Sequence, residues 1–173
     1  MTTAGPPDPD LRAATQALLT AGARFVVIGG FAVIANDYVR ATEDVDLLIP
    51  DDAANDLALG QALESLEARW PQGDRIFRAG DMQDREHSRI VWGAGLLDLL
   101  REGLAPLDFA SVAADARSAD LGDGSFLVAG LASVVAFKRL AGRPRDRLDL
   151  EELEARHGPL PMLPVPGLDL PLG

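Results

Sequence analysis

The sequence predicts an α+β fold, in which a small mixed β-sheet is flanked by helices and extra helices follow near the C-terminus. Short runs of Val, Ile and Leu alternate with longer segments of helical periodicity, and glycine or proline separates them. The chain has 173 residues and an apolar fraction of 47%, which suits one domain with a substantial core. We expect residues 1–157 to form this domain. Residues 158–173, with five prolines and three glycines, should form an irregular tail.

In the first half of the chain, capping residues and β-branched runs predict five elements. These are a helix capped by Asp8 and ending near Ala21, a strand over 24–28, a helix over 31–39, a strand over 44–49, and a long helix capped by Asp51 or Asp52 that ends near Trp70.

In the second half, glycine turns and a proline at a helix start define the boundaries. We expect strands over 75–78, 87–92, 96–100 and 125–128, and helices over 107–117, 131–141 and 144–157. The turn at residues 93–95 predicts a hairpin between the strands that flank it.

Composition excludes several classes of function. The formal net charge is −11, which argues against a module that wraps duplex DNA. The chain has no cysteine and only two histidines, so disulfides and a zinc site are not expected, and we assign no chemistry to His87 or His157. No apolar run is long enough for a membrane span, and the N-terminus does not resemble a signal peptide. We therefore expect a cytoplasmic protein.

The strongest motif is a glycine pair, Gly29 and Gly30, that thirteen residues separate from Asp44-Val45-Asp46. Alternate residues of a strand point to the same face, so Asp44 and Asp46 project together, about 6–7 Å apart along the strand. Like charges so placed repel each other, and a divalent cation between them would explain the arrangement. The glycine turn offers backbone N–H groups to phosphate oxygens.

A third acid, Asp98, lies between apolar residues of a later strand. If that strand is a neighbour of strand 44–49, the three carboxylates converge on one point. Three oxygen ligands with nucleotide phosphates suit Mg²⁺, in one or two ions, and transfer at the α-phosphorus of a nucleoside triphosphate. Asp98 would be a metal ligand or a general base. The alternative is a solvent-facing residue on an edge strand.

The only lysine of the chain, Lys138, begins a basic segment. Five basic residues fall within ten positions there: Lys138, Arg139, Arg143, Arg145 and Arg147. A lysine whose stem packs on apolar neighbours is the structural alternative to a substrate contact. Arg40, which lies between the glycine pair and the acidic pair, is a second candidate for binding phosphate.

These motifs resemble those of the polymerase-beta-type nucleotidyltransferase superfamily. The matching residues are Gly29, Gly30, Asp44 and Asp46, followed by Asp98 as the third acid. Segments 29–49 and 128–153 are similar to small bacterial AbiEii-type members, which include toxin nucleotidyltransferases. The resemblance covers less than half of the chain, and Gly30 replaces the serine found in some members.

The resemblance implies a minimal nucleotidyltransferase fold and transfer of a nucleoside monophosphate from a triphosphate such as ATP to an acceptor hydroxyl. It assigns Asp44, Asp46 and Asp98 to metal, and Gly29, Gly30 and Lys138 to the nucleotide. Arg40 joins the nucleotide-binding candidates because of its position between the glycine pair and the acidic pair. By position, Asp146 and Asp149 would support the lysine. The implied acceptor is an RNA end such as a tRNA 3′ terminus, and the implied partner is a cognate antitoxin.

Two alternatives remain open. The acceptor could be a small molecule such as an aminoglycoside, or a protein side chain, because an acidic surface also suits a cationic antibiotic. The chain could instead be a non-catalytic protein that binds a nucleotide and engages a partner through its tail.

Overall fold

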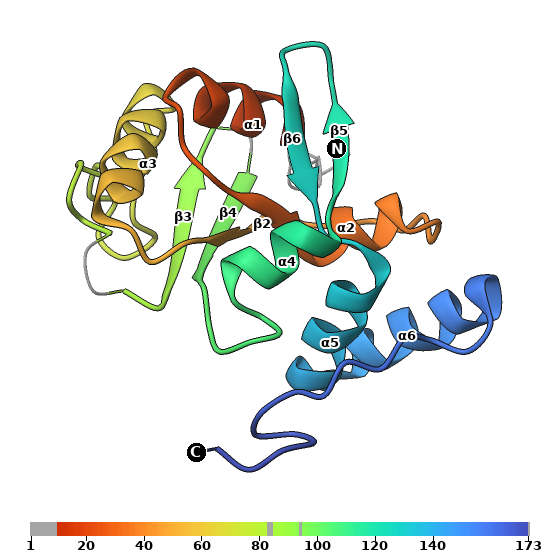
Figure 1. Ribbon diagram of the computed structural model, residues 1–173. Helices are drawn as coiled ribbons and strands as arrows, with labels where there is room; N and C mark the ends of the chain where they lie inside the picture. Colours follow the sequence, from red (N-terminus) through yellow and green to blue (C-terminus); the bar gives the residue numbers. More distant parts are fainter. Residues whose placement is uncertain (1–9, 83–84, 94, 173) are drawn as a thin grey trace.

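A computed structural model describes residues 10–82, 85–93 and 95–172 of the chain (Figure 1). The predicted Asp8 cap and residue 94 of the predicted turn lie outside these residues. Within them, helices and strands together form the α+β arrangement that the sequence predicts.

The described residues contain one mixed sheet of six strands, in the order β3-β4-β2-β1-β6-β5. β2 runs parallel to β4 and β1 runs parallel to β6, whereas the other neighbouring pairs are antiparallel. The strands are β1 (Val26–Ile28), β2 (Asp44–Ile49), β3 (His87–Trp92), β4 (Gly95–Arg101), β5 (Arg117–Asp120) and β6 (Ser125–Val128).

Six helices accompany this sheet in the described part of the chain, and aspartate side chains cap three of them. Asp10, Asp52 and Asp108 each accept a hydrogen bond from a backbone N–H in the first turn that follows. The helices are α1 (Leu11–Thr20), α2 (Gly29–Ala35), α3 (Ala53–Ser65), α4 (Phe109–Asp115), α5 (Leu131–Ala141) and α6 (Pro144–His157).

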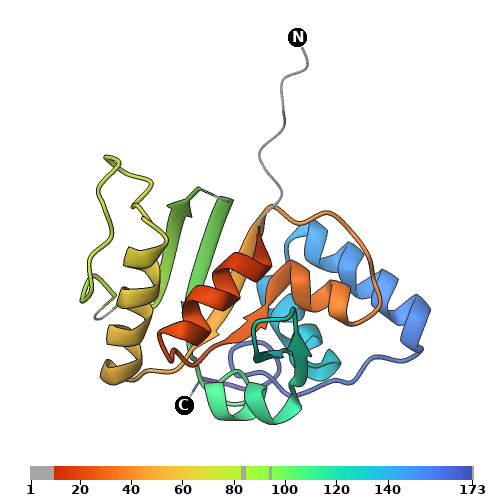
Figure 2. The same ribbon diagram turned by 90° about the horizontal axis from the view of Figure 1, so that it is seen from above.

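Four of the six helices in the described part of the chain form two pairs. In Figure 1, α1 and α3 lie together at the top left, and α5 and α6 lie together at the lower right, with the strands between the two pairs. Figure 2 shows the same separation from above. The core contains leucines of β2 and β4 together with Leu18, Leu59 and Leu63 of the first pair. Burial of this apolar surface fixes the central strands, which carry the candidate site.

Several predicted boundaries need correction. α3 ends at Ser65 rather than near Trp70, because the chain reverses at Glu67, which has a φ of +52°. α2 ends at Ala35, four residues before the predicted end. Residues 75–78 form no strand, and Ile76 makes only an isolated bridge to Arg69. β5 was not predicted, because its sequence, Arg-Ser-Ala-Asp, is mostly exposed and shows no apolar alternation.

The predicted hairpin of strands 87–92 and 96–100 is confirmed as the antiparallel pair β3 and β4. The helices predicted over 131–141 and 144–157 are also confirmed, and Gly142 separates them with a left-handed φ of +61°. The turn places the start of α6 close to the end of α5, which matters for the site described below.

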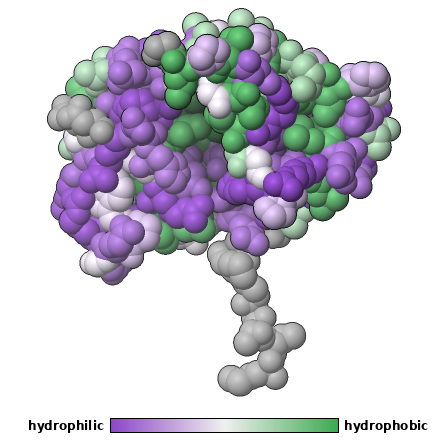
Figure 3. All heavy atoms as spheres, turned by 90° about the horizontal axis from the view of Figure 1, so that it is seen from below, coloured by the Kyte–Doolittle hydropathy of each residue, from purple (hydrophilic) through white to green (hydrophobic). Residues whose placement is uncertain are grey.

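Surface polarity is uneven. On the face seen from below, hydrophilic side chains cover much of the left and centre, while apolar ones gather near the upper and right edges (Figure 3). Among the residues that the structure describes, no helix has both the length and the apolar character needed to cross a membrane.

The C-terminal tail packs on the rest of the molecule although it forms no helix or strand. Val165 is only 1% exposed and packs in a small apolar cluster with Leu107 and Ala136. Arg139 of α5 forms an ion pair with Asp169 and donates a hydrogen bond to the carbonyl of Leu163. One buried side chain and one ion pair therefore hold the tail against α5.

Replacing Val165 with aspartate should release the tail, because a carboxylate at this buried position loses its hydration. We expect chymotrypsin to cleave within residues 158–172 at least about ten times faster than in the wild type, since local opening controls access. Leu172→Asp, at a side chain that is 70% exposed, is the matched control. Equal cleavage of both variants would contradict the packing described here.

Candidate active site

Three carboxylates converge where β2 and β4 lie side by side. The parallel register places Asp46 directly opposite Asp98, and Asp44 lies two residues earlier on the same face of β2. One oxygen from each carboxylate lies within 4.8 Å of the other two. We call Asp44, Asp46 and Asp98 the carboxylate triad. The convergence expected from the sequence is therefore present.

Burial and mutual repulsion make the negative form of two triad members unfavourable. Burial, together with the charges of Asp44 and Asp98, raises the pKa of Asp46 to about 6. Burial and the nearby Asp98 also raise the pKa of Asp44. The carboxylate triad is thus a concentration of negative charge that the surrounding protein compensates only in part.

Asp98 differs from its neighbours because Arg89 binds it. Arg89 stands opposite Asp98 in the β3–β4 register, and its Nε and Nη2 donate to the two carboxylate oxygens over 2.9 and 2.6 Å. Nη2 also reaches Asp44 at 3.3 Å, and His87 Nε2 lies 3.3 Å from Asp98 Oδ1. Burial alone would raise the pKa of Asp98, but the Arg89 guanidinium holds it below its usual value.

The glycine turn lies directly beside the carboxylate triad. Gly29 has a φ of +61°, and a Cβ atom there would lie 2.0 Å from Oδ2 of Asp46. A Cβ atom on Gly30 would lie 2.3 Å from the hydroxyl oxygen of Thr42. At Gly29 both the conformation and the space disfavour a side chain, whereas at Gly30 the lack of space does so. The backbone N–H of Gly30 limits the rise in the pKa of Asp46.

Lys138 is buried between two aspartates of α6. Its Nζ lies 2.8 Å from Asp146 Oδ1 and 2.9 Å from Asp149 Oδ2, and its side chain is only 8% exposed. Asp146 also accepts from the backbone and side chain of Arg143. Although burial opposes it, hydrogen bonds from Arg143 and Lys138 lower the pKa of Asp146. Buried charges that are paired in this way fix the start of α6 against α5.

Arg40 extends this buried network. Its Nε lies 2.7 Å from Asp149 Oδ1, and its Nη2 donates to Asp149 Oδ2 over 2.9 Å. Arg40 and Lys138 therefore share Asp149, and both side chains line the cavity beside the triad. The phosphate contacts expected of Arg40 and Lys138 remain predictions, and each residue already has an aspartate partner.

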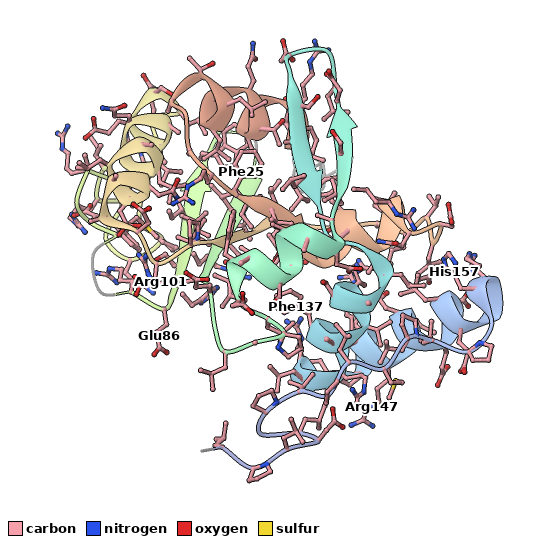
Figure 4. All side chains as sticks on the ribbon, viewed as in Figure 1. Phe25, Glu86, Arg101, Phe137, Arg147 and His157 are labelled. Carbon is pink, nitrogen blue, oxygen red and sulfur yellow. The ribbon has the colours of Figure 1, made fainter. Side chains whose placement is uncertain are left out.

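The basic side chains of segment 138–147 point to three different parts of the molecule. Lys138, Arg143 and Arg145 line the cavity, and Arg139 binds Asp169 of the tail. Arg147 projects from α6 on the side away from the sheet (Figure 4). A count of basic residues along the sequence therefore overstates the local positive charge.

The cavity, of about 410 Å³, brings together all seven site residues that the sequence predicts. It also contains Arg89 and Phe137, which the sequence did not single out, and His87, to which the sequence analysis assigned no chemistry. Alternation along β3 offers a signal for two of them, because His87 and Arg89 share one face of that strand. Figure 4 shows Phe137 on α5, which forms one wall. The full lining is Ile28, Gly29, Gly30, Arg40, Thr42, Asp44, Asp46, His87, Arg89, Asp98, Leu100, Val134, Phe137, Lys138, Ala141, Arg143, Arg145 and Asp146.

The residues present fit a divalent cation. The three carboxylates are hard oxygen ligands within reach of a common point, and the raised pKa of Asp44 and Asp46 indicates missing positive charge. A cation bound there would contact Asp44, Asp46 and Asp98.

Several solved structures have a fold similar to that of this chain. ANT(2″)-Ia, solved in complex with adenylyl-2″-tobramycin, is similar over 84% of this chain and 86% of its own, with a TM-score of 0.56 and 15% identity. A Thermotoga maritima protein proposed to be a nucleotidyltransferase is similar over 85% of this chain and 91% of its own, with a TM-score of 0.52 and 12% identity.

A nucleotidyltransferase-like protein from Paracoccidioides brasiliensis is similar over 85% of this chain and 76% of its own, with a TM-score of 0.52 and 18% identity. No protein-family model matches the sequence, and no curated protein gives a match. The chain therefore has a nucleotidyltransferase fold.

The glycine turn can be tested with two alanine substitutions that share a left-handed φ. Gly22→Ala, where nothing lies within 4 Å of the added Cβ, should cost about 1 kcal/mol of unfolding free energy. Gly29→Ala adds a clash with Asp46 and should cost about 1–3 kcal/mol more. Urea unfolding measures both. Equal losses would show that Asp46 does not lie against Gly29.

The raised pKa of Asp46 predicts a dependence of stability on pH. A carboxyl whose pKa is higher in the folded state destabilises that state as pH rises from about 4, the unfolded value, through about 6. Asp46→Asn removes this effect, so the variant should be more stable than the wild type by about 2–3 kcal/mol at pH 8, with little difference at pH 4. Urea unfolding at both pH values checks this. A difference that is independent of pH would refute the assignment.

Proposed function

We propose that this chain is a nucleotidyltransferase that moves a nucleoside monophosphate from a nucleoside triphosphate to an acceptor hydroxyl. The observation that carries the proposal is the carboxylate triad from two adjacent strands, facing one cavity beside the glycine turn. The fold likeness supports it. The cofactor we propose is Mg²⁺, as one or two ions.

In the proposed reaction, the acceptor oxygen forms a bond to the α-phosphorus, the bond from that phosphorus to the bridging oxygen breaks, and pyrophosphate leaves. Mg²⁺ held by the carboxylate triad would lower the pKa of the attacking hydroxyl and stabilise the charge on the leaving group. The low pKa of Asp98 makes it a weak base, which favours its role as a ligand.

The remaining lining residues suit the triphosphate. Backbone N–H groups of Gly29 and Gly30 can donate to phosphate oxygens, and Lys138 and Arg40 face the same cavity. Arg143, with a side chain that is 73% exposed, has the freedom to contact phosphate that Lys138 lacks. These residues would bind and orient the nucleotide, ATP being one candidate.

The cavity carries charges of both signs. Five arginine or lysine side chains and four carboxylates line it, whereas the whole chain carries a net charge of −11. The cavity is therefore less acidic than the chain as a whole, and it offers cationic side chains to a nucleotide beside the carboxylates that would hold its metal. For the acceptor we propose an RNA end such as a tRNA 3′ terminus, in the cytoplasm, with the chain acting as a toxin controlled by an antitoxin. The resemblance of segments 29–49 and 128–153 supports this choice.

A small-molecule acceptor is the second candidate. ANT(2″)-Ia shares the fold and was solved with adenylyl-2″-tobramycin, and the acidic surface of this chain would attract a cationic aminoglycoside. A protein side chain as acceptor, or nucleotide binding without transfer, would be distinguished by the same experiment.

We expect the purified chain, incubated with Mg²⁺ and each α-³²P-labelled nucleoside triphosphate, to transfer label to total RNA. Asp44→Asn, Asp46→Asn and Asp98→Asn should each lower the rate at least about a thousandfold, because each removes a ligand for the charge that develops in the transition state. Asp123→Asn, which affects surface contacts with Arg12 and Gln16 outside the cavity, should keep the wild-type rate.

Parallel reactions contain an aminoglycoside panel or cell protein in place of RNA. Label on an antibiotic or on protein would support the corresponding alternative acceptor and overturn the RNA proposal. Binding of nucleotide without release of pyrophosphate under any of these conditions would identify a non-catalytic binding protein.

A further inference from the structure

Arg89 occupies the position from which a cation would approach Asp98. Its two contacts use both carboxylate oxygens of Asp98, and a third contact reaches Asp44. A single guanidinium thus bridges two members of the carboxylate triad. Arg89 is the guanidinium in contact with the triad, whereas Lys138 and Arg143 act on it from a distance, so an attraction for a further cation remains.

Arg89 and a divalent cation would compete for Asp98, because both of its carboxylate oxygens accept hydrogen bonds from the guanidinium. Mg²⁺ binds carboxylate oxygens at about 2.0–2.1 Å in a nearly fixed octahedron. A guanidinium that donates to the same oxygens would place a like charge within a few ångströms of the ion, which is unfavourable. This repulsion favours the breaking of at least one contact between Arg89 and Asp98 when the cation binds.

The surroundings of Arg89 allow such a movement. It lies on β3, the outermost strand beside β4 in the sheet order, and its side chain is 50% exposed at the cavity. Lys138 differs in this respect, because it is enclosed by two buried aspartates. Of these two cationic side chains, Arg89 is the one free to turn away from its partner.

We propose that Arg89 is a positioning residue that serves as the resident counter-ion of Asp98 and is exchanged for the divalent cation. Without the cation, Arg89 holds the Asp98 carboxylate in the orientation that the ligand set requires. When the cation binds, the guanidinium releases Asp98 and stays at the cavity. Arg89 thereby weakens cation binding. This inference rests on the metal site of the proposed function.

Titration with Mn²⁺, followed by the electron paramagnetic resonance signal of the free ion, tests this exchange. Arg89→Gln removes a charge that opposes a divalent ion, so we expect the Kd for Mn²⁺ to fall about tenfold. Arg89→Lys keeps the charge and should stay within about threefold of the wild type. Arg12→Gln, which affects an ion pair with Asp123 outside the cavity, should leave the Kd unchanged.

A measurement on the wild-type chain accompanies the titration and does not depend on the stability of a variant. The Nε–H of Arg89 is hydrogen-bonded to Asp98, so its ¹⁵N-resolved NMR signal should be protected from exchange with water. Adding Mg²⁺ to saturation should remove that protection. The Nε–H of Arg40, which faces Asp149, is the internal reference and should keep its signal.

The outcomes separate the two proposals. Mn²⁺ binding that Asp98→Asn abolishes but Arg89→Gln leaves unchanged or weakens would overturn the exchange and keep the metal site. Protection of Arg89 Nε–H that survives saturating Mg²⁺ would also overturn the exchange. Absence of Mn²⁺ binding by the wild type and by Arg89→Gln would overturn the metal site and the exchange together.

Discussion

The candidate site depends on one constraint: the fold holds three carboxylates close together although their negative charges repel one another. The parallel register of β2 and β4 is fixed by buried leucines on both strands, and this same register places Asp46 opposite Asp98. Asp44 and Asp46 respond with a raised pKa, because burial and neighbouring negative charge oppose ionisation. Apolar burial thus provides the free energy that keeps like charges together, and the site retains an affinity for cations as a consequence.

Part of this site was predictable because it depends on local patterns. Alternation along a strand placed Asp44 and Asp46 on one face, and the glycine pair marked a turn where a side chain has no room. Asp98 required the further assumption that its strand is a neighbour of β2, which the structure confirms. These features follow from spacing within a segment, and spacing can be read directly from the sequence.

The rest of the site depends on contacts between distant segments. Arg89 reaches Asp98 only through the β3–β4 register, and nothing in the sequence of β3 identifies that partner. Lys138 is buried because α6 turns back at Gly142 and places two aspartates around it. β5 is a strand because it pairs with β6, although its own residues show no apolar pattern. In each of these three examples, contacts between segments that are distant in the sequence determine the structure, so the sequence of one segment does not predict it.

The pairing of charges on the two sides of the cavity explains why its cations cannot be treated as one basic patch. Lys138 and Arg40 share Asp149, so their charge is balanced within the protein and fixes the α5–α6 wall. Arg143 and Arg89 are half-exposed or more, and their aspartate partners lie at the cavity. A ligand that brings its own charges can exchange more readily with the second kind of pair, because the arginine of each pair is exposed although its aspartate is buried. The buried pairs would resist exchange, since separating them would leave an uncompensated charge inside the protein. Within this cavity, Arg40 therefore contributes to a rigid wall, whereas Arg89 and Arg143 are the arginines that can exchange partners with a ligand.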